Sequence, residues 1–206
     1  MCIVWSAISS TIHNMRIGLF GGSFNPIHYG HIRLARQLLA LAALDEVWFV
    51  VSPQNPLKQQ NDLLDDDLRL QMVEMALQRE KGLWACDIEF RLPRPSYTWN
   101  TLQTLRQEHP DDEFTLLIGG DNWERFPLWY RADDIVRDYD IVVYPRTGSD
   151  IDERQLPPTV RIVRTRRINI SSTMIRQRIA LGQTLSRLVP KAVADFIEKK
   201  RLYASL

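Results

Sequence analysis

Short apolar segments alternate with segments of helical periodicity along almost the whole chain, and this alternation restricts the fold more than any other feature. Strands that alternate with helices in this way form a parallel sheet through right-handed crossovers. The sequence therefore predicts an α/β, Rossmann-like, doubly wound sheet, mainly parallel, with helices on both faces and a C-terminal helical segment. The predicted strands are residues 16–22, 46–51, 83–88, 114–118, 141–144 and 160–163. The predicted helices are residues 29–43, 67–78, 98–108, 171–181 and 190–203.

The size and composition of the chain are those of an ordinary globular protein. Its 206 residues can bury a core without disulfides or metal, and no linker divides them, so we expect one domain over residues 15–206. Residues 1–14 form a predicted extension that is either disordered or not translated, because Met15 directly precedes the first strand. Only two cysteines occur, which favours a reduced, cytoplasmic protein.

The net charge of +1 argues against broad affinity for nucleic acid or for an anionic membrane. No apolar stretch approaches the roughly 20 residues that a membrane span requires. We therefore expect neither a nucleic acid nor a membrane as partner. A homo-oligomer is compatible with the sequence, which leaves the oligomeric state open.

The turn between the first strand and the first helix has the composition of a phosphate site. Gly21 and Gly22 allow the backbone to approach a ligand closely, and the N-terminus of the following helix offers unsatisfied N–H groups to an anion. His28 and His31 stand three residues apart and therefore on one face of the first helical turn. Imidazoles in this position can stabilise the charge that grows during phosphoryl transfer.

Other interpretations of this turn remain open. It does not fit the dinucleotide fingerprint G-x-G-x-x-G or the P-loop G-x-x-x-x-G-K-[ST]. An isolated pair of glycines is usually only a turn. Zinc binding by the two histidines would normally need a third ligand, and the remaining histidines, His13 and His109, lie in no recognisable motif.

Three further groups of polar residues are candidates. Ser171, Ser172 and Thr173 begin a predicted helix, where their hydroxyls can hold an anion or simply cap the helix. Asp121 follows a strand and suits either a ribose hydroxyl or a helix cap. Basic residues gather over 161–178; this stretch lacks aromatic interleaving, so we interpret it as a partly solvated rim that attracts an anionic ligand.

Several motifs together resemble one family. Residues 21–31, GGSFNPIHYGH, closely resemble the signature of the HxGH nucleotidyltransferase superfamily, and with His28 the segment is similar to bacterial nicotinate-nucleotide adenylyltransferases. Pantetheine-phosphate adenylyltransferases usually have Thr at that position. The chain departs from many relatives at residues 55–58, where NPLK replaces a PHK-like sequence. The other matching motifs, within a resemblance over about residues 15–205, are Ser52–Lys58, Pro95–Thr98, Ile118–Asp121 with Trp129–Tyr130, and Ile170–Thr173 with Arg176.

The resemblance implies transfer of AMP from ATP to the 5′-phosphate of nicotinic acid mononucleotide, which yields deamido-NAD and pyrophosphate in NAD biosynthesis. Because the nucleophile is already an anion, direct in-line attack needs alignment and charge neutralisation rather than a general base. Mg²⁺ is the expected cofactor and would bridge phosphate oxygens of ATP, since the sequence offers no dedicated carboxylate cage.

The resemblance also assigns roles to individual residues. The expected catalytic residues are His28, His31 and Arg176. The expected ATP and phosphate contacts are Gly21, Gly22, Ser23, Phe24, Lys58, Asp121, Ser171, Ser172 and Thr173. The expected nicotinate-nucleotide pocket consists of Tyr97, Thr98, Trp129 and Tyr130, where aromatic faces suit the pyridine and backbone N–H groups suit its carboxylate. No residues are expected to ligate a metal directly.

Two alternative functions remain. The chain could use another acceptor, such as pantetheine phosphate or a polyol phosphate, although His28 and the aromatic pocket count against this. It could instead be a non-catalytic nucleotide sensor that binds a partner through residues 161–178, although the intact histidine pair counts against lost catalysis. The sequence leaves the preference for the acid or the amide mononucleotide open.

Overall fold

The computed structural model describes residues 14–53, 63–145 and 151–204. Six strands form one sheet in the order β3-β2-β1-β4-β5-β6, and every neighbouring pair is parallel. The strands are β1 (Arg16–Gly22), β2 (Glu46–Val51), β3 (Leu83–Cys86), β4 (Glu113–Gly119), β5 (Asp140–Tyr144) and β6 (Val160–Ile162). The predicted doubly wound α/β fold is confirmed.

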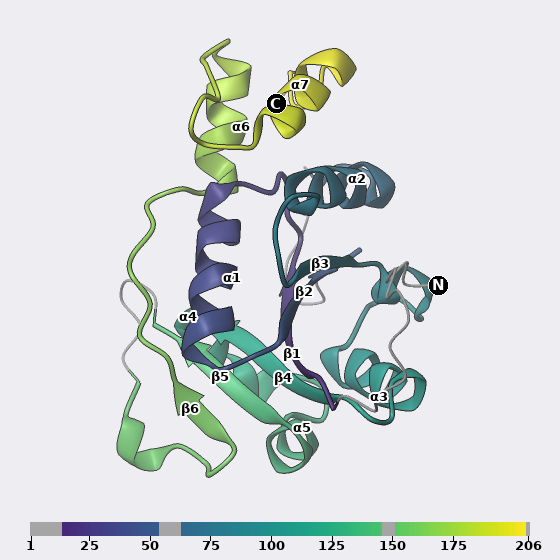
Figure 1. Cartoon of the computed structure of the whole chain (residues 1–206), viewed down its shortest axis with the longest axis vertical. Helices are drawn as coiled ribbons and strands as arrows, with labels where there is room; N and C mark the ends of the chain where they lie inside the picture. The colour runs from purple at the N-terminus through teal and green to yellow at the C-terminus, as the bar shows by residue number, and fades with distance from the viewer. Residues whose placement is uncertain (1–13, 54–62, 146–150, 205–206) are drawn as a thin grey trace.

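Within the part of the chain that the structure describes, seven α-helices connect and follow these strands (Figure 1). The helices are α1 (Tyr29–Leu41), α2 (Asp66–Leu77), α3 (Thr98–Glu108), α4 (Gly120–Trp123), α5 (Ala132–Asp138), α6 (Ser172–Ala180) and α7 (Lys191–Lys200). Short 3-10 turns occupy Ile88–Arg91, Phe126–Leu128 and Glu153–Gln155. Among residues 14–53, 63–145 and 151–204, no helix is long and apolar enough to cross a membrane.

The structure differs from the sequence prediction in two unpredicted helices and in the ends of several elements. Helices α4 and α5 were not predicted, because both are short and α5 buries only Ile135, which leaves no helical periodicity to detect. The third strand ends at Cys86 instead of residue 88, because Ile88 begins a 3-10 turn. The predicted N-terminal extension lies, except for Asn14, outside the described residues.

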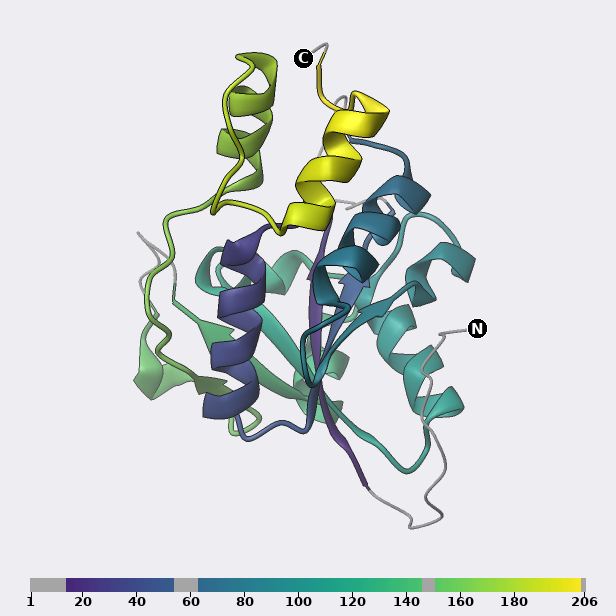
Figure 2. The same ribbon diagram turned by 45° about the horizontal axis from the view of Figure 1, so that its top comes forward.

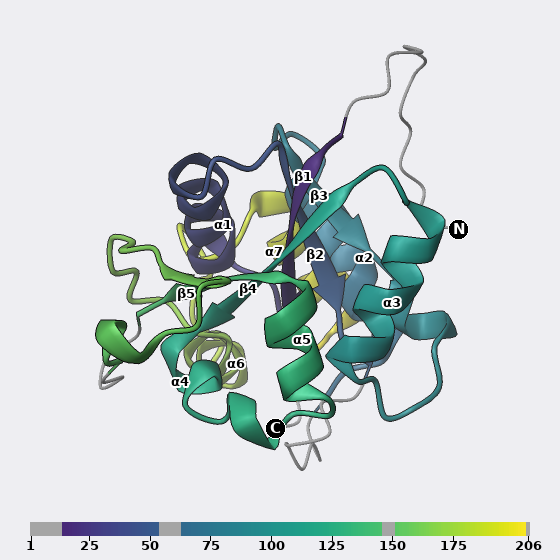
Figure 3. The same cartoon turned by 90° about the horizontal axis from the view of Figure 1, so that it is seen from below.

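The two faces of the sheet carry separate hydrophobic clusters. Along β2, Phe49 and Val51 belong to the cluster beneath α1 and α2, whereas Trp48 and Val50 belong to the cluster beneath α3 and α5. This follows from the period of two in a strand, which sends successive side chains to opposite faces. In Figure 1, α1 and α2 lie on one side of the strands and α3 and α5 on the other, and Figure 3 shows α1 and α3 on opposite sides from below.

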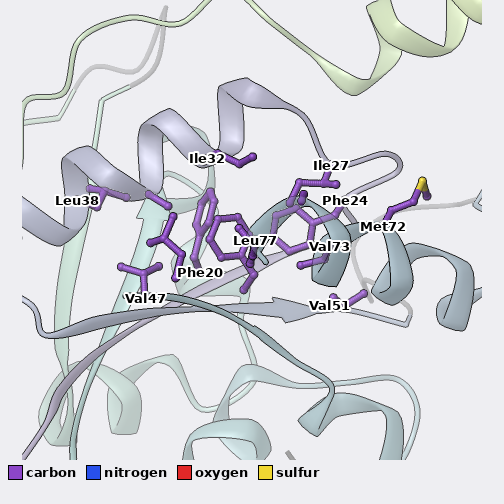
Figure 4. Close-up of a cluster of buried hydrophobic side chains, with 14 of the residues drawn as sticks. Phe20, Phe24, Ile27, Ile32, Leu38, Val47, Val51, Met72, Val73 and Leu77 are labelled. Atoms are coloured by element: carbon purple, nitrogen blue, oxygen red, sulfur yellow. The ribbon is translucent and has the colours of Figure 1, made fainter. Parts of the chain in front are cut away.

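The loop that follows β1 is anchored in the first of these clusters. Phe24, within the loop, is buried and packs edge-on against Phe20, with 5.8 Å between ring centroids. It also contacts Phe49 of β2 at 5.3 Å. Figure 4 shows Phe20 and Phe24 among the aliphatic side chains of α1 and α2. The glycine-rich turn therefore rests on a packed core.

Strand order reverses at β1, which places the carboxyl ends of β1 and β4 at a topological switch point. These two strands pair only as far as Leu19 and Leu116, although each continues, to Gly22 and Gly119. On its other side β1 stays paired with β2 through Gly22 and Val51. The two strands thus separate at the edge where doubly wound sheets bind their ligands.

The core cluster beneath α1 gives a stability prediction. Leu38 is 0% exposed and faces the sheet, so Leu38→Ala removes buried methyl groups and leaves a cavity. We expect a loss of about 3 kcal/mol in the free energy of unfolding, measured by urea denaturation. Leu41, 54% exposed on the same helix, is the matched control, and Leu41→Ala should change stability by less than about 0.5 kcal/mol. Equal losses in both variants would contradict the assigned orientation of α1.

Candidate active site

The loop of residues 22–28, called the phosphate loop after the ligand that the sequence predicts for it, joins β1 to α1 at the switch point. Phe24 adopts a left-handed backbone with φ of 44°, which an L residue holds only when its surroundings fix it. A Cβ atom on Gly22 would lie 2.9 Å from the Phe24 ring, so position 22 requires glycine. Ser23 and Gly22 are half-buried and Gly21 is exposed. At Gly22 the Phe24 ring therefore occupies the space that a side chain would need.

His28 and His31 stack on each other at the start of α1. Their ring centroids are 3.6 Å apart and their planes differ by 17°. His28 is the N-cap of the helix, and its Nδ1 accepts a hydrogen bond from the backbone N–H of His31 at 3.3 Å. Because Nδ1 is an acceptor, the neutral His28 ring carries its proton on Nε2. The sequence prediction that both rings share one face is met by this geometry.

Burial sets the protonation state of His28. Only 3% of the residue is exposed, and this loss of solvent lowers the pKa of His28 from its usual 6.5 to about 4, against a smaller opposing effect of a backbone hydrogen bond. The ring is therefore neutral at pH 7. A neutral imidazole at this position donates one hydrogen bond through Nε2 and adds no net charge to the loop.

Gly30, between the two histidines, makes room for the His28 ring. A Cβ atom at this position would lie 2.7 Å from Nδ1 and 2.8 Å from Cε1 of His28. It would also lie 3.3 Å from Cβ of Ile170, in the segment before α6. Glycine at position 30 is thus what permits the stacked arrangement of the pair.

The C-terminal helices dock on the phosphate loop (Figure 2). Ser172 Oγ donates to the Pro26 carbonyl at 2.9 Å, and Nη1 of Arg176 donates to the Asn25 carbonyl at 3.0 Å. Ser171 is the N-cap of α6, where its Oγ accepts from the N–H of Met174 at 3.2 Å, so capping accounts for this serine. Ser171 and its neighbour Thr173 are exposed, whereas Ser172 and Arg176 are half-buried.

The other predicted residues that the structure describes lie in the segments that follow β3 and β4. Asp121 is exposed in the first turn of α4, whose N-cap is Gly119, so Asp121 is not a cap. Tyr97 immediately precedes α3, Thr98 begins that helix, and the Tyr97 ring lies 4.9 Å from the ring of Tyr130. Trp129 is half-buried and packs against Phe126, while Tyr130 is 51% exposed. Lys58 lies outside the described residues.

Sequence reasoning assigned no role to four buried polar residues in or near the loop, which are Asn25, Tyr203, Glu89 and Arg69. Tyr203, near the C-terminus, donates through its hydroxyl to Oδ1 of Asn25 at 2.7 Å. Glu89 accepts from Ser52 Oγ at 2.8 Å and from Thr101 Oγ1, and its burial raises its pKa. The fourth, Arg69, is fully buried. Its sequence signal was an arginine on the apolar face of α2, in register with Met72, Val73 and Ala76.

The basic rim is only partly available to a ligand. Arg164 forms an ion pair with Glu153, and Arg161 donates to the Ala42 carbonyl at 2.8 Å. Arg178 donates to the carbonyl of Thr184, in the segment that follows α6.

The described residues hold no group of three or more His, Cys, Asp or Glu side chains placed to bind a metal ion. A divalent cation that arrives with a nucleotide can take its oxygen ligands from phosphates and water instead. The donor set of the phosphate loop, backbone N–H groups and neutral imidazole, suits phosphate oxygens.

The fold and this edge of the sheet define an α/β protein of the doubly wound, parallel class with its candidate site at the switch point. The chain belongs to the cytidylyltransferase-like family, whose model matches residues 19–178.

Individual relatives are close in sequence and in fold. A Bacteroides fragilis protein named probable nicotinate-nucleotide adenylyltransferase is 48% identical, over 86% of this chain and 89% of that protein. A Bacteroides thetaiotaomicron protein of the same name is also 48% identical, over 91% and 93%. The solved structure of Plasmodium falciparum nicotinic acid mononucleotide adenylyltransferase complexed with NaAD shares the fold, with a TM-score of 0.76 and 21% identity over 92% of this chain and 97% of that one.

The environment of His28 predicts its titration. In an NMR pH titration, the His28 ring, assigned by its absence from the His28→Gln spectrum, should titrate with a midpoint near 4. The unfolded chain takes up this proton near pH 6.5, so the free energy of unfolding should fall as the pH drops from about 6.5 to 4 and should not depend on this group above that range. A midpoint near 6.5 would contradict the buried, neutral ring.

Proposed function

We propose that this chain is a nicotinate-nucleotide adenylyltransferase, which transfers AMP from MgATP to nicotinic acid mononucleotide. The observation that carries the proposal is the stacked His28–His31 pair at the N-terminus of α1, beside a glycine-dependent loop at the switch point. The names of the relatives that are 48% identical support the choice of acceptor. The products are deamido-NAD and pyrophosphate.

The reaction requires no covalent bond between the protein and either substrate. An oxygen of the mononucleotide 5′-phosphate attacks the α-phosphorus of ATP and forms the new P–O bond. The bond between the α-phosphorus and the bridging oxygen breaks, and pyrophosphate leaves with the electron pair. Because the attacking group is already an anion, no side chain has to remove a proton, and catalysis depends on alignment and on stabilising charge.

Residues of the phosphate loop, of α1 and of α6 would together align the substrates and stabilise the charge. Backbone N–H groups at Ser23 and Phe24 and the N-terminus of α1 would bind triphosphate oxygens. His28, neutral at pH 7, would donate from Nε2, and His31 beside it would bind oxygens near the reacting phosphorus. Arg176 keeps several N–H donors besides the one on the Asn25 carbonyl, and we assign these to the leaving pyrophosphate. Mg²⁺ bound to ATP would supply further neutralisation of the phosphate charge.

The acceptor pocket would lie at the start of α3. Tyr97 and Tyr130 offer aromatic faces to the pyridine ring. The first turn of α3 has no acidic residue, and its N-cap, Tyr97, makes no side-chain capping bond. The backbone N–H groups in the first turn of α3 therefore suit a carboxylate. We propose that the protein prefers the acid mononucleotide over the amide.

The cellular location belongs to the same proposal. Only two cysteines occur, and Cys86 is buried in the core, as expected of a protein that needs no disulfide. We propose a cytoplasmic location, where ATP is available as MgATP.

An acceptor panel tests the function. Purified protein is incubated with MgATP and, separately, with nicotinic acid mononucleotide, its amide counterpart and pantetheine phosphate, while pyrophosphate release and product are recorded. We expect kcat/KM for the acid to exceed that for the amide by at least about tenfold, because a site built to hydrogen-bond a carboxylate discriminates against a ligand that leaves it unpaired. Preferential use of pantetheine phosphate would contradict the assigned acceptor. ATP binding without turnover of any acceptor would indicate the nucleotide sensor.

The role of the histidine pair is tested by His31→Ala. Removing one donor aimed at the reacting phosphates should lower kcat by about 10²- to 10³-fold while far-UV circular dichroism stays unchanged. Arg36→Ala is the control on the same helix, since Arg36 is exposed and pairs with Glu80 away from the loop. If His31→Ala keeps the wild-type kcat, the pair does not take part in the reaction.

A further inference from the structure

Arg69 is the one fully buried arginine among the described residues, at 0% exposure. Arginine is rarely buried without partners, because removing its charge from water is costly. Its Nη1 donates to the carbonyls of Ser23, at 2.6 Å, and Ser52, at 2.9 Å. Its Nε donates to the carbonyl of Leu64 at 2.9 Å, and it forms an ion pair with Asp66.

These partners lie at the edge of the sheet where the candidate site is built. Ser23 belongs to the phosphate loop after β1, and Ser52 directly follows β2. The backbone N–H of Ser52 in turn donates to the Gly22 carbonyl at 2.9 Å. One guanidinium therefore ties the loop after β1 to the end of β2 and to α2. An apolar side chain would fill the same space without the cost of burying a charge, so packing alone does not explain an arginine.

Peptide geometry gives the contact with Ser23 a functional consequence. The carbonyl of Ser23 and the N–H of Phe24 belong to one planar trans peptide, in which the two groups point in opposite directions. Because Arg69 holds the carbonyl, the N–H of Phe24 is directed away from the guanidinium. Phe24 also has a left-handed φ of 44°, a conformation that must be held by its surroundings.

We propose that Arg69 is a positioning residue for phosphate binding: by holding the Ser23 carbonyl, it directs the N–H of Phe24 at the triphosphate of ATP. This inference rests on the proposed function, because it takes the phosphate loop as the triphosphate site. Arg69 does not touch substrate itself. It acts through the backbone of the loop, with Asp66 orienting the guanidinium.

The other side of the loop has further contacts that do not involve the Ser23 carbonyl, although the N–H of Leu64, whose carbonyl accepts from Arg69, also donates to Oδ1 of Asn25 at 3.5 Å. Tyr203 and Arg176 both donate to Asn25, at 2.7 Å and 3.0 Å. A change at Arg69 should therefore release the Ser23–Phe24 peptide while the contacts of Asn25 with the C-terminal segment persist. This separation makes a specific defect in phosphate binding the expected result, rather than a general loss of the site.

The test uses Arg69→Lys and Arg69→Met, with Arg94→Met as the matched control. Arg94 is exposed and pairs with the same carboxylate, Asp66, at 2.7 Å, so its loss tests that ion pair without the loop contacts. Calorimetry with inorganic tripolyphosphate and Mg²⁺ reports phosphate binding, and steady-state kinetics report KM for MgATP. We expect about tenfold weaker tripolyphosphate binding and a comparable rise in KM for both Arg69 variants. The Arg94 variant should stay within about twofold of the wild type.

A purely structural role would lower the melting temperature and the fraction of active protein but would leave KM for MgATP and tripolyphosphate affinity unchanged. That result in a folded Arg69 variant would overturn the proposal. A measurement on the wild type does not depend on how the variants fold: the Phe24 amide resonance should shift downfield as tripolyphosphate is added. If tripolyphosphate binds and this resonance does not move, the proposal is wrong.

These outcomes are distinct from failure of the proposed function. If the wild type converts ATP and nicotinic acid mononucleotide while the Arg69 variants bind tripolyphosphate as well as it does, only the role of Arg69 is refuted. If the wild type neither turns over any acceptor nor binds tripolyphosphate, the proposed function fails, and the role of Arg69 fails with it.

Discussion

The separation of β1 and β4 is the constraint on which the rest of the structure depends. Both strands continue past their last paired residues, Leu19 and Leu116, while β1 stays bonded to β2 through Gly22. The two strands separate because the strand order reverses at β1. Backbone groups at the carboxyl edge of the sheet are therefore available to a ligand. The stacked histidines, the start of α4 and the docked helix α6 all gather at this one edge.

The loop at this edge is held in an unfavourable conformation by contacts on three sides. The ring of Phe24 packs into the core below, Arg69 holds the Ser23 carbonyl, and Tyr203 and Arg176 hold Asn25 from the C-terminal segment. A loop fixed in this way loses little entropy when it binds phosphate, because it is ordered before the ligand arrives. The same contacts explain why helices at the far end of the chain belong to the site.

The sequence predicted the parts of this structure that have local signals. The strands and long helices follow from periodicity, and the common face of His28 and His31 follows from helical spacing. In the network beneath the loop, the one local signal is Arg69 on the apolar face of α2, and nothing in the sequence indicates its partners. Arg69 contacts a residue 46 positions away, and Tyr203 one that is 178 positions away. Helix α5 was not predicted, because it buries a single residue and so shows no helical periodicity of apolar residues.

A crystal structure with Mg²⁺ and a non-hydrolysable ATP analogue tests the central claim most directly, namely that the loop between β1 and α1 binds the triphosphate. The account predicts phosphate oxygens within about 3.2 Å of the Phe24 N–H and of the His28–His31 pair. It also predicts a Ser23 carbonyl that remains on Arg69. A triphosphate bound instead along the basic rim at Arg161–Arg167, with the loop left empty, would contradict it.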